Sequence, residues 1–428
     1  MDIMYDAIIV GAGPAGSIAA YVASKLGFKV LIIDRFRFPR FKPCGGGLTQ
    51  KSILLLRSLG LDLNGVVRDE CRRVVVINSA GSFILTDNDP IITVVSRDEF
   101  DNYLLSNALE LGTDYIVDRV VNVRTNGDHV NVIGMDNTYI GRYVIAADGA
   151  NSIIAKYLGN DIRRNAAMAF MTIAHGNYFD NICVIDMTRI KWGYSWIFPR
   201  SGGEYDIGIG SIHWDNYRTQ LIRYVHDAGL REGEIRGHPI PIKPRERITS
   251  KRIVLVGDAG GFADPITGEG IFYAMYSGAL AALALKHSSN PTEFANNYLR
   301  TIRPLIKNLS LAYYLSLGTY GIDHLVMGRL GLSAFSVAST RNLIKKVMKG
   351  GTWYHQMPIS IIKFSILKGP RLMLEKNTAR MIFRLLIEDK APLFLRFFFK
   401  PFSSHFLSAL WRFLRRLGSS LCNLSYSV

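Results

Sequence analysis

The chain of 428 residues is longer than one ordinary hydrophobic core requires, so we expect two or three packed units. A hydrophobic content of 48% excludes a disordered protein, and the net charge of +16 at pH 7 favours anionic partners. The four cysteines (Cys44, Cys71, Cys183 and Cys422) lack metal-ligand spacing and the nine histidines form no cluster, which predicts a reduced compartment and no metal site.

The N-terminal segment has the pattern of a dinucleotide-binding unit. An apolar strand at residues 5–10 is followed by the sequence GAGPAG, a helix-forming run and a second strand that ends in Asp34. In such a unit Gly11 makes the tight turn, Gly13 lets a pyrophosphate approach, and Gly16 lets the helix pack on the strand. We expect Asp34 to accept hydrogen bonds from ribose hydroxyls, and the pattern by itself fits FAD or NAD.

The segment from Arg97 to Asp148 continues this unit. Arg97 opens a helical run, where we expect its guanidinium to reach a phosphate, although a surface arginine without a ligand fits the pattern too. Residues 119–124 and 129–133 then predict a hairpin, and a strand at 143–147 follows.

An aromatic strand stands out in the middle of the chain, in the sequence WGYSWIFP. Because side chains alternate along a strand, Trp192, Tyr194, Trp196 and Phe198 are predicted to share one face as an aromatic wall for an apolar substrate. A plain hydrophobic core face would give the same pattern. Strand alternation over 71–86 and 166–213 predicts one antiparallel sheet around this wall.

The sequence LVGDAGGFADPITGEGI, from residue 255, predicts a strand, a glycine-rich turn and a helix. Asp258, at the strand end, is placed to accept from ribityl hydroxyls. Gly268 and Gly270 carry no Cβ to keep a planar ring away, and a helix beginning near Ile271 directs unpaired N–H groups at that ring. Together with the GAGPAG segment, this pattern favours a flavin, whereas alone it fits an ordinary strand-turn-helix.

Most of the excess positive charge lies in residues 341–428, interleaved with phenylalanine and leucine. The apolar residues between 402 and 417 follow one helical face, which predicts a helix lying on an anionic membrane. A docking helix with a solvated basic face is the alternative. The phenylalanine density and the lack of a recognition motif argue against a nucleic acid partner.

Targeting signals are sparse. The first strand begins almost at the N-terminus without a basic leader, and apolar windows such as 270–285 are shorter than the roughly 18 residues of a spanning helix. We therefore expect a cytoplasmic protein that associates peripherally with a membrane.

These patterns predict an α/β protein with a Rossmann-like FAD-binding domain, an antiparallel β-sheet substrate domain and a helical, basic C-terminal region. We expect the FAD-binding domain to be discontinuous, because its motifs are separated by strand-rich segments. The expected bounds are 1–67, 92–161 and 249–287 for the FAD-binding domain, 68–91 and 162–248 for the substrate domain, and 288–428 for the C-terminal region.

Four motifs together resemble the FAD-dependent geranylgeranyl reductases, over about the first 300 residues. They are GAGPAG, KPCGGG at residues 42–47, YxWxFP at 194–199 followed by GxG at 208–210, and GDAGGFADPITGEGI. The resemblance implies a p-hydroxybenzoate hydroxylase-like fold and FAD-dependent saturation of isoprenoid C=C bonds in archaeal-type lipids, chlorophyll-type side chains or quinone tails. It places FAD contacts at Ala15, Asp34, Cys44, Gly45, Gly47, Arg97, Val120, Asp258, Gly270 and Ile271.

Two positions depart from the wider superfamily. Ala155 stands where its second nucleotide motif often has arginine, and Gly261 stands where related hydroxylases often have histidine. The first departure leaves the nicotinamide contact open, and no second GxGxxG follows a strand. The electron donor is therefore NAD(P)H visiting transiently, or a ferredoxin.

The expected chemistry delivers a proton to one alkene carbon and a hydride from reduced FAD to the other. Cys44 borders the ring and is a candidate proton relay, or simply a small residue in a flavin-contacting turn. Tyr194 and Trp196 are candidates to stabilise developing positive charge in a dry pocket. A flavin-dependent halogenase or monooxygenase, a quinone-linked electron-transfer flavoprotein, and a flavoprotein that presents prenyl lipids without catalysis are the alternatives.

Overall fold

The structure is a computed structural model, and its described residues all belong to one compact unit within Met1–Met357. The predicted amphipathic segment at 402–417 and Cys422 lie outside the described residues. The described residues are 4–63, 65–78, 81–163, 165–177, 180–213, 215–321 and 348–350.

An eight-stranded sheet confirms the predicted α/β class. Its path runs β17-β18-β11-β1-β2-β8, with parallel pairing from β18 to β8, and the hairpin β9–β10 joins it through β11. Because parallel strands share a direction, the segments that follow β1, β2 and β18 meet at one edge of the sheet. The strands are β1 (Met4–Val10), β2 (Val30–Asp34), β8 (Asp114–Val117), β9 (Asn122–Asn126), β10 (His129–Ile133), β11 (Thr138–Ala146), β17 (Thr249–Ser250) and β18 (Ile253–Leu255).

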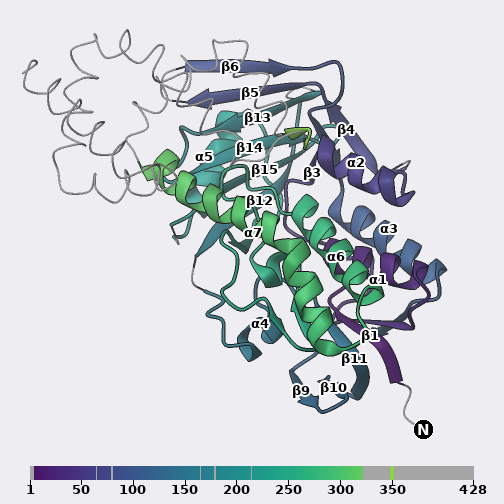
Figure 1. The fold of residues 1–428 in the computed structure, drawn as a ribbon. Helices are drawn as coiled ribbons and strands as arrows, with labels where there is room; N and C mark the ends of the chain where they lie inside the picture. Colours follow the sequence, from purple (N-terminus) through teal and green to yellow (C-terminus); the bar gives the residue numbers. More distant parts are fainter. Residues whose placement is uncertain are drawn as a thin grey trace, which may run out of the picture. The chain divides into compact units, whose positions relative to one another are not determined.

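Helices α1 (Pro14–Lys25), α6 (Ile271–Lys286) and α7 (Pro291–Gly321) lie next to one another (Figure 1). The crossing of α1 and α6 is close, because a Cβ on Gly278 would overlap the carbonyl oxygen of Ala15. Tyr298 of α7 donates a 2.7 Å hydrogen bond to the Leu255 carbonyl, which ties α7 to the end of β18. Among the described residues, no helix combines the length and the apolar character that a membrane span requires.

A second, seven-stranded sheet has the order β16-β12-β15-β14-β13-β5-β6. Its pairs are antiparallel as predicted, except that β13 pairs with β5 in parallel. β5 and β6 come from an earlier part of the chain and join the sheet at β13. The strands are β5 (Arg73–Asn78), β6 (Gly81–Thr86), β12 (Ala166–His175), β13 (Ile182–Asp186), β14 (Gly193–Pro199), β15 (Glu204–Ser211) and β16 (Arg236–Pro241).

A small antiparallel sheet, β3-β7-β4, completes the strands. It precedes α3 (Arg97–Glu110), so the prediction that Arg97 opens a helix is confirmed. The remaining elements are β3 (Gly47–Thr49), β4 (Val67–Cys71), β7 (Ile92–Val95), α2 (Gln50–Leu59), α4 (Ile153–Tyr157), α5 (Arg218–Asp227) and the 3₁₀ turn η1 (Gly257–Gly260).

Two of the expected strand boundaries shift as follows. The first hairpin strand begins at Asn122 rather than at 119, and β18 ends at Leu255, one residue earlier than predicted. Asp258 consequently lies in the 3₁₀ turn η1 and not at a strand end. The helix predicted near Ile271 begins there.

The three glycines of GAGPAG differ in what surrounds them. Gly11 has φ +103, in the left-handed region, and a Cβ on Gly16 would overlap the Gly11 carbonyl oxygen. Gly13 is open: a Cβ there would have Arg40 Nη2, at 3.7 Å, as its nearest neighbour. Gly11 and Gly16 are therefore required by the fold, whereas Gly13 leaves room for a ligand.

We expect Gly16→Ala to lower the free energy of unfolding by about 3 kcal/mol, because the added methyl meets backbone that cannot move aside. Gly13→Ala should cost less than about 1 kcal/mol, since its Cβ meets only a side-chain end. Denaturant titration of the flavin-free protein would measure both values. Equal stability of the two variants would contradict this account of the turn.

Candidate functional site

The first part of the site is the turn between β1 and α1. Asp34 Oδ2 accepts the Ala12 N–H at 2.7 Å, and Oδ1 accepts the Phe36 N–H at 2.9 Å. Asp34 thus holds the turn in place, in addition to its predicted role with a ribose. The helix α1 begins after Gly13 without a side-chain cap. Its first N–H groups and its dipole therefore favour an anion at the open Gly13 position.

Two guanidinium groups converge on Asp101 beside that position. Arg97 forms a bidentate pair with Asp101, with both N–O distances 2.8 Å, and Arg40 Nη2 lies 3.2 Å from Asp101 Oδ2. Arg97 is thus already paired with a carboxylate, although we predicted it to reach a phosphate. Among the described residues, Arg40 Nη1 is buried and has no hydrogen-bond partner. Arg40, which sequence reasoning missed, is therefore the group that best fits a diphosphate next to Gly13.

Lys42 and His238 belong to the same positively charged region. Burial lowers the pKa of Lys42 to about 8, with the Arg97 and Arg40 charges acting in the same direction. Burial and the charges of Lys42, Arg97 and Arg35 lower the pKa of His238 to about 3, so His238 is neutral near pH 7. Lys42 is the first residue of the KPCGGG motif but was given no role from the sequence, and His238 was not singled out. Such a concentration of half-buried cations around Arg40, Lys42 and Arg97 indicates that the site accommodates negative charge.

The Cys44–Gly47 turn forms a second part of the site. Gly46 has φ +65, and a Cβ on Gly45 would lie 2.6 Å from Trp196 Nε1. A Cβ on Gly47 would lie 2.9 Å from the Phe198 ring. The backbone of Gly45 and Gly47 in the KPCGGG motif thus packs directly on the aromatic rings of Trp196 and Phe198.

Arg97 connects this turn to the cationic region. Burial lowers its pKa, but the negative charge of Asp101 and the paired hydrogen bonds to it raise it above the ordinary value. Cys44 acts in the same direction, so the Arg97 guanidinium lies close to the Cys44 side chain.

The aromatic row of β14, which consists of Tyr194, Trp196 and Phe198, faces the Cys44–Gly47 turn and the Gly268–Gly270 turn. Tyr194 and Trp196 have ring centroids 6.2 Å apart, and the Tyr194 hydroxyl donates a 2.5 Å hydrogen bond to the Thr267 carbonyl. A Cβ on Gly268 would overlap that hydroxyl. Burial, and then the charges of Asp264, Cys44 and Glu269, raise the pKa of Tyr194, so it stays a neutral phenol.

The two glycines of β15 are those of the GxG sequence that follows the YxWxFP motif. Gly208 pairs with Trp196 and Gly210 with Tyr194 across the sheet. A Cβ on Gly208 would overlap the Trp196 ring, so the indole lies flat over the neighbouring strand. Among the described residues, Trp196 Nε1 is buried without a hydrogen-bond partner. An N–H left unpaired in this position fits a polar ligand atom.

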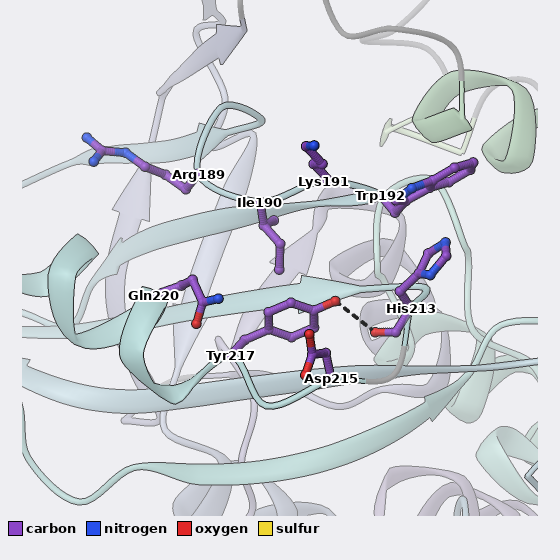
Figure 2. Close-up of a pocket in the computed structure, with 8 residues that line it drawn as sticks. All are labelled: Arg189, Ile190, Lys191, Trp192, His213, Asp215, Tyr217 and Gln220. Atoms are coloured by element: carbon purple, nitrogen blue, oxygen red, sulfur yellow. Dashed lines mark hydrogen bonds between the residues drawn. The ribbon is translucent and has the colours of Figure 1, made fainter.

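Trp192 does not continue the row. The structure begins β14 at Gly193, and Trp192 has φ +62, with its ring centroid 4.8 Å from that of His213. The prediction of four aromatics on one strand face is therefore wrong at Trp192, because the left-handed backbone breaks the alternation. Trp192 and His213 line a pocket of about 360 Å³ whose lining includes none of the predicted cofactor residues. Figure 2 shows the two rings side by side and Tyr217 donating to the His213 carbonyl.

The 3₁₀ turn and the start of α6 supply the remaining predicted cofactor residues. A Cβ on Gly270 would lie 3.8 Å from Asp258 Oδ1, so the Asp258 carboxylate lies near the first residues of α6. Ile271 is buried there. Ala15 lies close by, since its Cβ is 3.0 Å from a Cβ built on Gly257. Val120 is in another cluster, packed among strands of the eight-stranded sheet.

A buried network of hydrogen bonds and one ion pair holds Glu269, the middle residue of the Gly268–Gly270 turn. Lys51 Nζ lies 2.6 Å from Glu269 Oε2 and donates to the Tyr273 hydroxyl at 3.1 Å. Thr49 donates to Glu269 Oε1 at 2.5 Å, and Tyr273 donates to Asp264 Oδ2 at 3.1 Å. Sequence reasoning missed this network, which joins residues more than 200 positions apart.

Comparisons with known proteins agree with this geometry. The family described as FAD binding domain matches residues 4–195. The chain is 32% identical over 314 residues to a geranylgeranyl diphosphate reductase of Rhodobacter capsulatus, covering 68% of this chain and 78% of that protein. It is 31% identical over 317 residues to a menaquinone reductase of Mycobacterium tuberculosis, covering 66% and 76%. A digeranylgeranylglycerophospholipid reductase of Thermoplasma acidophilum is 29% identical over 340 residues, covering 71% and 83%.

Solved structures share the fold. A geranylgeranyl bacteriochlorophyll reductase-like protein of Thermoplasma acidophilum has a TM-score of 0.70 at 23% identity, over 82% of this chain and 97% of that one. A flavin-dependent brominase has a TM-score of 0.69 at 21% identity, over 86% and 100%. The chain therefore belongs to the geranylgeranyl reductase family of FAD-dependent oxidoreductases, enzymes that act on CH–CH groups.

Proposed function

We propose that the protein saturates C=C bonds of isoprenoid chains carried by membrane lipids or prenylquinones. The observation that carries this proposal is the convergence of β14 on both glycine segments, through Trp196 at Gly45 and Tyr194 at Gly268. An apolar, aromatic wall placed against backbone without side chains suits a flat ring on one side and a hydrocarbon chain on the other. The relatives named as reductases of geranylgeranyl compounds and of menaquinone support the same substrate class.

The residues present fit FAD. Gly13 is open, Arg40 has a buried unpaired nitrogen beside it, and the α1 N-terminus adds its dipole, which together suit a diphosphate. In this proposal Gly11, Gly16 and Asp34 shape the nucleotide turn. Ala15, Arg97 and Val120 are further proposed contacts of the cofactor. The Cys44–Gly47 turn, Asp258 and the Gly268–Ile271 segment border the ring.

Reduced FAD, when bound, supplies the hydride that an isolated alkene needs. The chain itself must exclude water, hold the alkene and supply a proton. Tyr194, Trp196 and Phe198 provide aromatic faces, worth about 0.5 to 2 kcal/mol toward developing positive charge. We propose the Cys44 thiol as the proton donor, because it opens the glycine turn that packs against Trp196 and Phe198 and carries a transferable proton.

The domain bounds, the electron donor and the membrane association are also proposals. We propose the domain bounds given above, NAD(P)H or a ferredoxin as electron donor, and peripheral binding of the basic C-terminal region to an anionic membrane from the cytoplasmic side. The net charge of +16 supports the membrane contact.

The direct test uses purified protein with its flavin reduced by dithionite under argon. After addition of geranylgeranyl lipids or prenylquinones, we expect flavin reoxidation and a mass gain of two hydrogens for each bond reduced. A product halogenated in air with added halide would instead indicate the activity of the brominase that shares this fold. Flavin that no prenyl compound reoxidises would refute the proposed reaction.

Replacing the proposed proton donor should separate chemistry from cofactor binding. We expect Cys44→Ser to lower alkene turnover about 100-fold, the usual contribution of a positioned general acid, while the flavin stays bound. Single-turnover reoxidation of the reduced flavin by substrate measures this step. Cys422→Ser is the matched control, because it removes a thiol that lies outside the four motifs in the sequence. Full turnover by Cys44→Ser with bound flavin would disprove the proton relay.

The Lys51–Glu269 pair should behave as one buried unit. Lys51→Met or Glu269→Gln alone leaves a buried charge without its partner, so each should cost about 3 kcal/mol of stability and weaken FAD binding. The double variant should lose less than the sum of the single losses. Denaturant titrations of the four proteins, with flavin titrations of each, measure the coupling. Additive losses would show that the pair does not hold the turn.

A further inference from the structure

Two buried thiols lie against each other where two sheets meet. Cys71 is the last residue of β4 in the three-stranded sheet, and Cys183 lies in β13 of the seven-stranded sheet. Their Sγ atoms are 2.6 Å apart. Both residues are 0% exposed.

The surroundings of this pair contain apolar side chains. The cluster around the two sulfurs consists of Val74, Leu85, Ile91, Ile92 and Val94. Burial, and then the hydrogen bond with Cys71, raise the pKa of Cys183. Carbon atoms without a bond between them settle about 3.5 to 4.0 Å apart, and sulfur is larger, so this backbone holds the two sulfurs closer than unbonded contact favours.

We propose that Cys71 and Cys183 form a disulfide bond in the oxidised protein, a modification site separate from the flavin site. The oxidant is a low-molecular-weight disulfide. One thiol loses its proton and attacks that disulfide, releasing one small thiol and leaving a mixed disulfide. The second thiol then displaces the other small thiol. Two S–H bonds are lost, one S–S bond forms, and the two electrons and two protons leave on the two small thiols.

The position of the bond gives it a structural role. β4 pairs with β7, which also pairs with β3, the strand that begins at Gly47. β13 pairs with β14, which carries the aromatic row. The bond would therefore cross-link β4 and β13, one strand from each of the two sheets that contain Gly47 and the aromatic row. It would also make these two of the four cysteines an exception to the reduced state that their spacing predicted.

Thiol counting on the full chain tests the proposal. The protein is opened in mild denaturant with glutathione disulfide, refolded, freed of small thiols and then fully unfolded for titration with Ellman's reagent. We expect two titratable thiols, compared with four after dithiothreitol, and a digest that contains one linked peptide pair with Cys71 and Cys183. Four thiols after oxidation, or linkage through Cys44 or Cys422, would overturn the proposal.

A melting experiment provides a second, independent readout. Closing a loop of more than 100 residues should raise the melting temperature of the oxidised protein by roughly 5 °C over the reduced one. The Cys44→Ser/Cys422→Ser double variant should keep this difference, and the Cys71→Ala/Cys183→Ala double variant should lose it. A Cys44→Ser/Cys422→Ser chain that melts at the same temperature in both redox states would also refute the bond.

Discussion

The structure depends on close contact between backbone and rings. At Gly45, Gly47 and Gly208, a single added methyl would press on an aromatic ring, and at Gly268 it would overlap the Tyr194 hydroxyl. These contacts bring segments that are distant in the sequence within van der Waals reach. The site is therefore shaped by missing side chains as much as by those present.

Charge is the second organising feature. Arg40, Arg97, Lys42 and the neutral His238 share one region, and Asp101 balances two of the guanidinium groups. Asp101 is fully buried, so each arginine that faces it is held in one orientation. An anion that enters beside Gly13 then meets oriented donors without having to reorganise them. The Lys51–Glu269 pair likewise holds the Gly268–Gly270 turn through a buried ion pair.

The sequence predicted the parts of the site that depend on local backbone. GAGPAG, the start of α3 at Arg97 and the start of α6 at Ile271 follow from short-range patterns of strand, turn and helix, and the structure confirms those starts. Trp192 was misplaced because a left-handed φ at a non-glycine residue has no signal in an alternating strand pattern. Arg40, Lys51 and Glu269 were missed because their roles come from partners far along the chain, which periodicity does not report. The same limit applied to β13 and β5, whose parallel pairing depends on two distant segments.

That parallel pairing has a consequence for synthesis on the ribosome. The β5–β6 hairpin emerges about a hundred residues before β13, the strand that covers its inner edge. Until then, the hairpin presents unpaired backbone groups and the apolar run Val74–Ile77 to the surrounding solution. The nascent chain is thus most prone to mispairing with other chains in this interval, and a holding chaperone that binds extended apolar segments would be most useful there.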